Sequence, residues 1–377
     1  MGALRLFLIA GEPSGDRLGA ALMAGLRALN PEVTFTGVGG PLMQDQGLQS
    51  LFPMEELSVM GIAEVLPKYF HLKRRIAEAA AAALAAKPAA MITIDSPDFC
   101  LRVASIVKSA QPALKTIHYV APSVWAWRPG RAAKMARVID HVLALLPFEP
   151  PYMTAAGMSC DFVGHPVVAE PLATPEERAL MAGEGPLILA LPGSRRGEVT
   201  RLAPVLGQVL AQIKEAHPTA RVALPTVRGV ADLVAELSDK WPIRPQIIRD
   251  PAEKRAAFAM ADVAIAASGT VSLELAANDC PMVIAYDMHP LTLWLMRCAA
   301  LIDTVTLVNL VSETRAVPEF IGERCRADLI APEGLRLLAE GPGPQAEAMR
   351  LTMERLGKGG EAPGLRAARS VLGFLEG

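Results

Sequence analysis

The chain has 377 residues, a length that suggests two domains, each large enough for its own hydrophobic core. Its 37 basic and 39 acidic residues give a formal net charge of −2, which does not favour non-specific nucleic-acid binding. The five cysteines include no C-x-x-C pair, and no two histidines are spaced as metal ligands, so we expect a reduced cytosolic protein without a metal. No uncharged stretch of roughly 18 or more apolar residues predicts a membrane span.

Short apolar runs alternate with helical patterns along the chain. In the first half we expect strands at residues 4–10, 33–36, 90–94, 116–120, 142–145 and 161–163, and helices at 17–29, 71–86, 99–110 and 130–139. In the second half we expect strands at 187–191, 221–224, 246–248, 263–267, 282–286 and 306–308, and a helix at 199–216. The first run passes directly into polar residues, which indicates a buried strand and not a signal peptide.

Apolar strands between helices indicate parallel sheets covered on both faces. The pattern predicts an α/β protein with two doubly wound, Rossmann-like domains. We expect a first domain at residues 1–170, a second at 171–345 and a helical tail at 346–377. Because ligands of such folds bind outside the carboxyl ends of the strands, the loops after the strands are the candidate site.

The loop at residues 191–198 follows an apolar run and precedes a helical pattern. Its Gly193, Ser194 and Arg195 place backbone N–H groups and a forked cation at a helix start, which suits a phosphate. An ordinary exposed loop with solvated arginines is the alternative.

Residues 267–274 repeat this strand, glycine loop and helix order. Ser268, Gly269 and Thr270 could donate to a diphosphate, and Glu274 could accept from ribose hydroxyls. Asn309 follows the expected strand at 306–308, where an Asx turn is an equally good interpretation.

Two loops of the first half carry carboxylates. In the loop at residues 11–16, Ser14 or Asp16 could cap a helix beginning near Arg17, or the loop could be a simple turn. Asp95 ends an expected strand, where it could take a proton from a sugar hydroxyl, although a capping role fits equally well. Asp98, one step into the next helix, fits a partner for the helix dipole.

Two further segments contain aromatic or apolar residues that could contact a ligand or a membrane. Trp125 and Trp127 stand in one loop and could stack on sugars or acyl chains, or form a core pair. The segment 59–75 has the composition of an interfacial helix at anionic lipid, or of a core helix with a solvated basic end. Its membrane-facing candidates are Val59, Met60, Ile62, Val65, Leu66, Phe70, Lys73, Arg74 and Arg75.

Together these motifs resemble the lipid-A-disaccharide synthases of glycosyltransferase family 19. The resemblance lies in G-E-P-S-G-D (11–16), M-G-I-A-E-V-L (60–66), D-S-P-D-F (95–99), H-Y-V-A-P-S-V-W-A-W-R (118–128), L-P-F-E (146–149), F-V-G-H-P (162–166), L-P-G-S-R (191–195), A-S-G-T-V-S-L-E (267–274) and N-L (309–310). The block around the two tryptophans is highly specific, whereas the phosphate-type loops are not.

The resemblance implies a GT-B fold, with two Rossmann-like domains facing a central cleft. It implies inverting transfer of 2,3-diacylglucosamine from UDP-2,3-diacylglucosamine to 2,3-diacylglucosamine 1-phosphate (lipid X), which gives the β-1,6 disaccharide 1-phosphate and UDP. It also implies a peripheral protein at the cytoplasmic face of the inner membrane, with no cofactor and no nucleic-acid partner. A homodimer is one candidate for its oligomeric state, and the tail could pack back on the first domain.

Carried onto this chain, the resemblance makes Asp95 the general base. Arg195, Glu274 and Asn309 match positions at the UDP end of the donor, and Glu12 and Ser14 match the first-loop site. Asp98, Trp125 and Trp127 then belong to the acceptor side. Pro13 and Pro129-Gly130 depart from the family pattern, which leaves the shape of the acceptor pocket open.

Inversion needs one displacement with one base, unlike the paired carboxylates of retaining glycosidases.

Three alternative functions fit the sequence less well. Another GT-B enzyme on a UDP-amino sugar is the nearest, either a UDP-N-acetylglucosamine 2-epimerase or the peptidoglycan N-acetylglucosaminyltransferase. A nicotinamide oxidoreductase would need G-x-G-x-x-G, which residues 37–40 do not supply. A periplasmic sugar-binding protein would carry a signal peptide.

Overall fold

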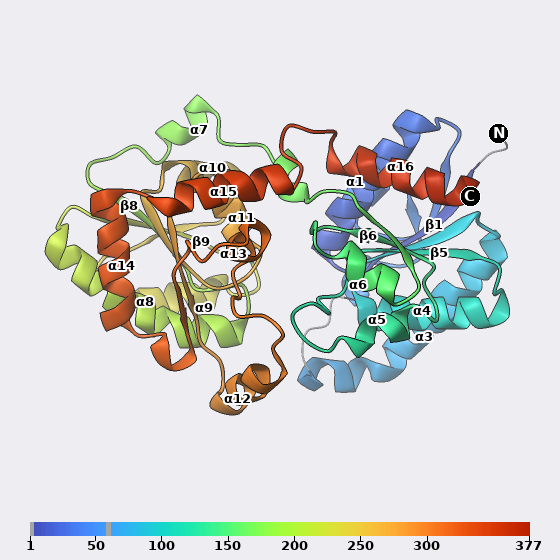
Figure 1. The fold of residues 1–377 in the computed structure, drawn as a ribbon, viewed down its shortest axis with the longest axis horizontal. Coiled ribbons are helices and arrows are strands. Elements are labelled where there is room, and N and C mark those ends of the chain that lie inside the picture. The colour runs from blue at the N-terminus through green and yellow to red at the C-terminus, as the bar shows by residue number, and fades with distance from the viewer. Residues whose placement is uncertain (1–3, 58–61) are drawn as a thin grey trace. The chain divides into compact units, whose positions relative to one another are not determined.

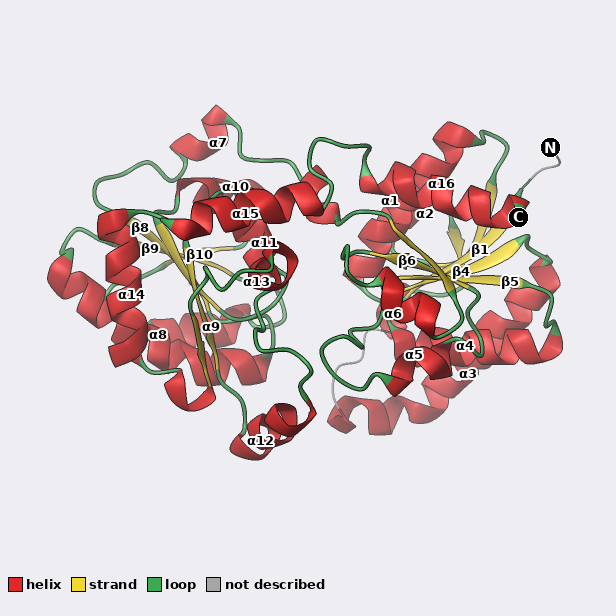
Figure 2. Ribbon diagram, in the orientation of Figure 1, coloured by secondary structure: helices red, strands yellow, loops and turns green. Residues whose placement is uncertain are grey.

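The computed structural model describes residues 4–57 and 62–377, and of residues 62–69, 290–291 and 297–298 it describes the backbone alone. The chain divides into two compact units. Unit 1 comprises Met1–Ala169 and Gly359–Gly377, and unit 2 comprises Glu170–Lys358. Helices cover both faces of the sheet in each unit, as Figure 2 shows, which confirms the expected α/β class with two doubly wound domains.

Unit 1 contains a seven-stranded parallel sheet in the order β3-β2-β1-β4-β5-β6-β7. The strands are β1 (Arg5–Ala10), β2 (Thr34–Val38), β3 (Gln49–Ser50), β4 (Ala90–Ile94), β5 (Lys115–Tyr119), β6 (His141–Ala144) and β7 (Ser159–Phe162). The helices are α1 (Pro13–Leu29), α2 (Pro41–Asp45), α3 (Ile62–Ala86), α4 (Pro97–Ala110), α5 (Gly130–Met135), α6 (Pro150–Ala155) and α16 (Pro363–Glu376).

Strand β1 explains how this sheet is covered. Its side chains alternate between the two faces, as the pleat requires. Leu6 and Leu8 join a core with α1 and α16, whereas Phe7 and Ile9 join a second core with α3 and α4. After the exposed Arg5, every position of β1 is apolar, and the strand therefore lies in the middle of the sheet, buried on both sides.

The chain end returns to unit 1, where α16 lies against α1 (Figure 1). Two glycines allow this close crossing. A Cβ on Gly25 would lie 2.5 Å from the carbonyl oxygen of Gly364, and a Cβ on Gly364 would lie 2.6 Å from that of Ala21. We expected one helical tail at residues 346–377, but the structure divides it, because α15 belongs to unit 2 and α16 to unit 1.

Unit 2 contains a six-stranded parallel sheet in the order β10-β9-β8-β11-β12-β13. The strands are β8 (Leu187–Leu191), β9 (Arg221–Pro225), β10 (Gln246–Ile248), β11 (Val263–Ala266), β12 (Met282–Tyr286) and β13 (Glu319–Ile321). The helices are α7 (Pro175–Ala179), α8 (Arg196–Ala216), α9 (Ala231–Ser238), α10 (Pro251–Met260), α11 (Val271–Ala277), α12 (Pro290–Ala299), α13 (Leu307–Ser312), α14 (Ala327–Glu340) and α15 (Pro344–Arg355).

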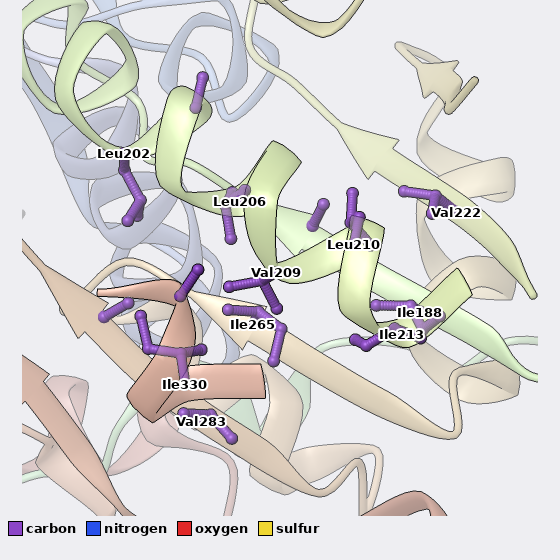
Figure 3. Close-up of a cluster of buried hydrophobic side chains, with 14 of the residues drawn as sticks. Ile188, Leu202, Leu206, Val209, Leu210, Ile213, Val222, Ile265, Val283 and Ile330 are labelled. Carbon is purple, nitrogen blue, oxygen red and sulfur yellow. The ribbon is translucent and has the colours of Figure 1, made fainter. Parts of the chain in front are cut away.

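One face of this second sheet packs on α8 and α14. Figure 3 shows side chains of α8 lying over the sheet, with Leu206 and Val209 near Ile265 and Ile213 beside Ile188, and with Ile330 of α14 near Ile265. The spacing of these α8 residues at three and four positions places them on one stripe of the helix. This packing fixes the start of α8, and with it the loop that precedes it.

Two local predictions were wrong. Residues 306–308 do not form a strand, because Thr306 is the N-cap of α13 and β13 begins only at Glu319. Helix α1 begins at Pro13 and not near Arg17, since proline fits the first helical turn. Asp16 is consequently inside α1, where its buried carboxylate caps α2 by accepting the N–H groups of Gly40 and Met43 at 2.9 and 3.0 Å.

Candidate functional site

Each sheet has one point at which the strand order reverses. In unit 1 it lies between β1 and β4, and in unit 2 between β8 and β11. Ligands of open α/β sheets bind outside the carboxyl ends of the strands at such points. The loops after these four strands are the four glycine- or carboxylate-bearing loops that the sequence singled out.

In unit 1 the loops after β1 and β4 are joined by side-chain hydrogen bonds. The Ser14 hydroxyl donates to Asp95 Oδ2 at 3.0 Å, and the Ser96 hydroxyl donates to Glu12 Oε1 at 3.3 Å. A Cβ on Gly11 would lie 2.8 Å from Ser96 Oγ, so the glycine permits this approach. The structure thus brings Glu12, Ser14 and Asp95 together and adds Ser96, which was not predicted as a site residue.

The backbone at the end of β4 is strained. Asp95 and Ser96 have φ values of 54° and 43°, in the left-handed region that non-glycine residues rarely occupy. The Asp95 N–H donates to the Tyr119 carbonyl at 3.0 Å, and the Ser96 N–H donates to Asp95 Oδ1 at 2.9 Å. These bonds hold a partly exposed carboxylate in one orientation at the strand end, as a catalytic base requires.

The two candidate carboxylates have different surroundings. Asp98 is exposed in the first turn of α4, where a negative charge interacts favourably with the helix dipole. Asp95 instead has one oxygen bonded to Ser14 and the other to the Ser96 N–H. This arrangement favours Asp95 as the base and a dipole-partner role for Asp98.

The tryptophan loop follows β5, next to β4. Val120 and Arg128, near its two ends, have φ values of 86° and 53°, and a β-branched residue at positive φ is a genuine outlier. Trp125 is buried and packs edge-on against Phe148, with ring centroids 5.1 Å apart. Trp127 is half-buried, and the Arg128 guanidinium lies 4.1 Å from its ring centroid. The loop therefore contains one core tryptophan and one that solvent reaches.

In unit 2 the loop after β8 has a feature that the sequence analysis did not predict. Glu198, in the first turn of α8, accepts the N–H groups of Ser194 and Arg195 at 3.2 and 3.3 Å. This is the back-bond of a capping box. Two of the backbone N–H groups that we expected to bind an anion therefore already donate to the Glu198 carboxylate. The Arg195 side chain remains 67% exposed, although its guanidinium contacts Glu198 at 3.2 Å.

The loop after β11 is open at Gly269, but the hydroxyl of Ser268 already has a hydrogen-bond partner. Gly269 has a φ of 149°, and no atom lies within 4 Å of the position of a Cβ there. The Ser268 hydroxyl donates to the Val305 carbonyl at 3.1 Å, whereas Thr270 is exposed and its side chain makes no capping bond. Of these three residues, Gly269 and Thr270 leave the backbone most accessible to a ligand.

Glu274 has a partner from another helix. Lys254 of α10 forms an ion pair with the Glu274 carboxylate in the first turn of α11, and its ammonium also lies 5.2 Å from the Phe258 ring centroid. Lys254 was not predicted from the sequence, because only the packing of α10 beside the sheet brings it to α11. The pair places a positive charge next to the glycine loop.

Asn309 is not at a strand end. It is 1% exposed on α13, where its amide donates to the Val317 carbonyl at 2.9 Å and accepts the Val317 N–H at 3.0 Å. These bonds tie α13 to the segment before β13. In this structure Asn309 therefore positions the backbone, and its amide is not open to a ligand.

Comparisons with known proteins identify the family of this chain. Residues 6–362 match the family model described as lipid-A-disaccharide synthetase. The lipid-A-disaccharide synthase of Ruegeria pomeroyi is 62% identical, over 99% of this chain and 96% of its own length. The chain belongs to the lipid-A-disaccharide synthase family. The synthase of Rhodospirillum centenum, 46% identical over 100% of this chain and 96% of its own length, supports this membership.

Solved structures of low identity show the same fold. A UDP-N-acetylglucosamine 2-epimerase from Neisseria meningitidis bound to UDP-N-acetylglucosamine has a TM-score of 0.65 at 11% identity, with 99% of each chain covered. The MurG of Acinetobacter baumannii has a TM-score of 0.54 at 14% identity, with 99% of each chain covered. The chain thus has the GT-B fold and is an enzyme of the family that forms the lipid A disaccharide.

The membrane-facing candidates are only partly described. Val59 and Met60 lie outside the described residues, and the side chains of Ile62, Val65 and Leu66 on α3 are likewise outside the description. Phe70 is 81% exposed, and Lys73 and Arg74 are exposed as well.

Arg75 differs from its two basic neighbours. It pairs with Glu56 at 2.7 Å and Glu78 at 2.6 Å, and it lies over the Phe52 ring. Its hydrogen bond is the main cause that lowers the pKa of Glu56. Arg75 is thus committed to ion pairs within unit 1, so among the described side chains of this segment the exposed basic ones are Lys73 and Arg74.

The described residues contain neither a membrane-spanning helix nor a metal-binding group of side chains. No helix among residues 4–57 and 62–377 is both long and apolar enough to cross a membrane. Within the same residues, no group of three or more His, Cys, Asp or Glu side chains is arranged to hold a metal ion.

Proposed function

We propose that this enzyme transfers 2,3-diacylglucosamine from UDP-2,3-diacylglucosamine to lipid X with inversion at the anomeric carbon. Asp95 takes the proton of the acceptor 6-hydroxyl. The oxygen then forms a bond to the sugar anomeric carbon, the bond from that carbon to the diphosphate breaks, and UDP leaves. The observation that carries this proposal is the fixed, partly exposed Asp95 carboxylate at the switch point of unit 1.

Unit 2 supplies the groups for the leaving diphosphate. The exposed Arg195 fork can bind two phosphate oxygens, and the glycine loop at 268–270 leaves backbone N–H groups accessible. Glu274, held by Lys254, is the candidate acceptor for ribose hydroxyls. A positive guanidinium aimed at the leaving group stabilises the charge that grows on it in the transition state.

The acyl chains of both substrates require contact with a bilayer. We propose that unit 1 binds peripherally to the anionic cytoplasmic leaflet of the inner membrane through the segment 59–75. The 81% exposure of Phe70 and the exposed Lys73 and Arg74 support this proposal. An apolar side chain beside basic residues is typical of segments that insert at a charged lipid surface.

The direct test is a transfer assay. Purified protein, UDP-2,3-diacylglucosamine and lipid X are incubated with mixed micelles, and thin-layer chromatography detects the disaccharide while a coupled assay measures UDP. The proposal predicts both products in equal amounts and none without acceptor. Conversion of UDP-N-acetylglucosamine to its epimer in the absence of lipid X would instead support the epimerase alternative.

A further inference from the structure

Glu149 is a buried carboxylate to which the proposed chemistry gives no role. It is 3% exposed and lies between the carboxyl end of β6 and the start of α6. Its Oε2 accepts the N–H groups of Leu145 and Leu146 at 3.1 and 2.9 Å. Its Oε1 accepts the indole N–H of Trp125 at 3.2 Å. Three donors from two loops therefore converge on one side chain.

A buried carboxylate is costly unless its hydrogen bonds compensate for the lost water. Burial raises the pKa of Glu149 to about 7, and the three donors oppose this increase. The neighbouring groups are Trp125, Phe148 packed edge-on against it, and the thiol of Cys160 on β7, whose pKa is raised mainly by burial and further by the Glu149 charge. An amide or an apolar residue would avoid this cost, so the acceptor-only chemistry of a carboxylate is what the position uses.

The indole that Glu149 holds belongs to the loop beside Asp95. Tyr119, the last residue of β5, accepts the Asp95 N–H at 3.0 Å, and the loop begins with the strained Val120 directly after it. The loop ends at Arg128, whose guanidinium lies over the half-buried Trp127 ring. A strained loop keeps one conformation only where its surroundings over-determine it. In the middle of this loop the Trp125 indole is buried and hydrogen-bonded to Glu149, next to Val124, which packs in the core.

We propose that Glu149 is a positioning residue for the acceptor: through the Trp125 indole it fixes the loop 120–128, so that Trp127 and Arg128 form an aromatic and cationic surface beside Asp95. The chemistry of this surface fits a phosphorylated, acylated sugar. The cation binds an anionic oxygen, and the ring packs on apolar or sugar surfaces. This inference rests on the proposed function for the identity of the acceptor, but the contact between Glu149 and Trp125 does not.

Glu149→Gln separates the bond to the Trp125 indole from the two bonds to the backbone of Leu145 and Leu146. The amide oxygen of glutamine can still accept from Leu145 and Leu146, but its NH2 group then faces the indole N–H, and two donors cannot bond. Trp125→Phe is the matched variant, because it removes the indole N–H and retains the aromatic packing on Phe148. We expect each variant to raise the KM for lipid X roughly 10-fold to 100-fold, the loss typical of one hydrogen bond to a charged group. UDP affinity should stay within about twofold, since unit 2 carries that site.

The double variant and the tryptophan spectrum distinguish positioning from a general structural role. If Glu149 acts through Trp125, the double variant has a KM no higher than the worse single variant. The near-ultraviolet circular dichroism of the free protein should change in Glu149→Gln, and the same substitution should change nothing in a Trp125→Phe background. The parent protein should show a spectral transition near pH 7 that Glu149→Gln lacks, because protonation places an O–H opposite the indole donor.

Fully additive KM effects, or a tryptophan spectrum that Glu149→Gln leaves unchanged, would overturn the inference. The spectra need no substrate, so they stand even if the parent protein fails to transfer the sugar, in which case the proposed function fails and the contact remains. If Glu149→Gln does not fold, Trp125→Phe alone still decides the matter, since an unchanged KM for lipid X in that variant contradicts the positioning role.

Discussion

The two units form their strand-end loops by different means. In unit 1 the loops after β4 and β5 place positive φ angles at residues with side chains: Asp95, Ser96, Val120 and Arg128. In unit 2 the corresponding loops after β8 and β11 use Gly193 and Gly269, with φ values of 109° and 149°. Glycine exposes backbone N–H groups to a ligand without steric cost, whereas a strained aspartate aims a carboxylate. The difference fits a division of labour in which unit 1 performs proton transfer and unit 2 binds the diphosphate.

Strain of this kind persists only when other contacts hold it. A non-glycine residue at positive φ costs about 1–3 kcal/mol. In unit 1 the Ser14 hydroxyl and the Tyr119 carbonyl hold Asp95, and the Val120 N–H donates to the Leu143 carbonyl at 3.0 Å. In unit 2 a side chain at Gly193 would instead collide with Glu198, because a Cβ would lie 2.6 Å from its carboxylate oxygen.

The largest expected effect is the loss of turnover when Asp95 of unit 1 is replaced. Asp95→Asn keeps the shape of the side chain but removes the base, and we expect turnover to fall roughly 100-fold to 10,000-fold. Asp98→Asn is the matched control, since Asp98 is exposed in the next helical turn, and we expect nearly parental turnover. Rates come from the transfer assay, and UDP affinity from calorimetry should be unchanged in both variants. Comparable losses in the two variants would contradict the assignment of the base.

The second effect concerns the diphosphate in unit 2. Arg195→Ala removes a forked, charge-assisted contact, and we expect UDP affinity to fall roughly 10-fold to 100-fold. Arg196→Ala, at the first residue of α8, should lower UDP affinity less. We also expect transfer to continue in EDTA, because a guanidinium and a helix start can carry the leaving-group charge. Activity that disappears in EDTA and returns with Mg²⁺ would refute this account of unit 2.

The third effect tests where lipid contact lies. Replacing Val65, Leu66 and Phe70 together by Ser should weaken sedimentation with anionic vesicles by about tenfold, through lost apolar burial. Salt should release the parent protein in part, since charges are screened over about 8–10 Å at physiological ionic strength. The matched control replaces three exposed apolar residues of unit 2 by Ser, namely Leu172, Leu180 and Val227, which are 48%, 53% and 50% exposed. Equal sedimentation of the first variant and the parent would place the lipid contact elsewhere.

The smallest effect measures the strain itself. Ser96→Gly should relieve the left-handed backbone and raise the free energy of unfolding in urea by about 1 kcal/mol, while turnover falls because the end of β4 loosens. Lys87→Gly is the control, with a φ of 45° just after α3, and it should give a similar stability gain with unchanged turnover. If both variants keep full activity, the strained backbone at Ser96 has no part in catalysis.

Much of the architecture was predictable because it depends on local pattern. A strand that is apolar at every position, such as β8, can only be buried between two helical layers, and the loops after such strands mark the switch points. The strand-end rule singled out the loops that carry Ser14 and Asp95, whereas Glu12 was named only through the family resemblance.

The unpredicted features depend on partners distant in the sequence or on competition for the same donors. The pairs Lys254 with Glu274 and Trp125 with Glu149 form only after the helices pack. Glu198 takes the N–H groups that the sequence assigned to a phosphate, because a glutamate at the third helical position can reach back to them. Asn309 was misplaced because two of the residues 306–308, Thr306 and Val308, are β-branched, as in a strand, yet the packing of α13 overrides that propensity.

The most direct test of the division of labour is a single-turnover transfer measurement with both substrates saturating, made beside UDP affinity, on Asp95→Asn and Arg195→Ala. The account predicts a crossed result. Asp95→Asn loses roughly 100-fold or more of the saturated rate with UDP affinity unchanged, and Arg195→Ala loses UDP affinity while its saturated rate falls far less. A matched loss of rate and of UDP affinity in both variants would contradict it.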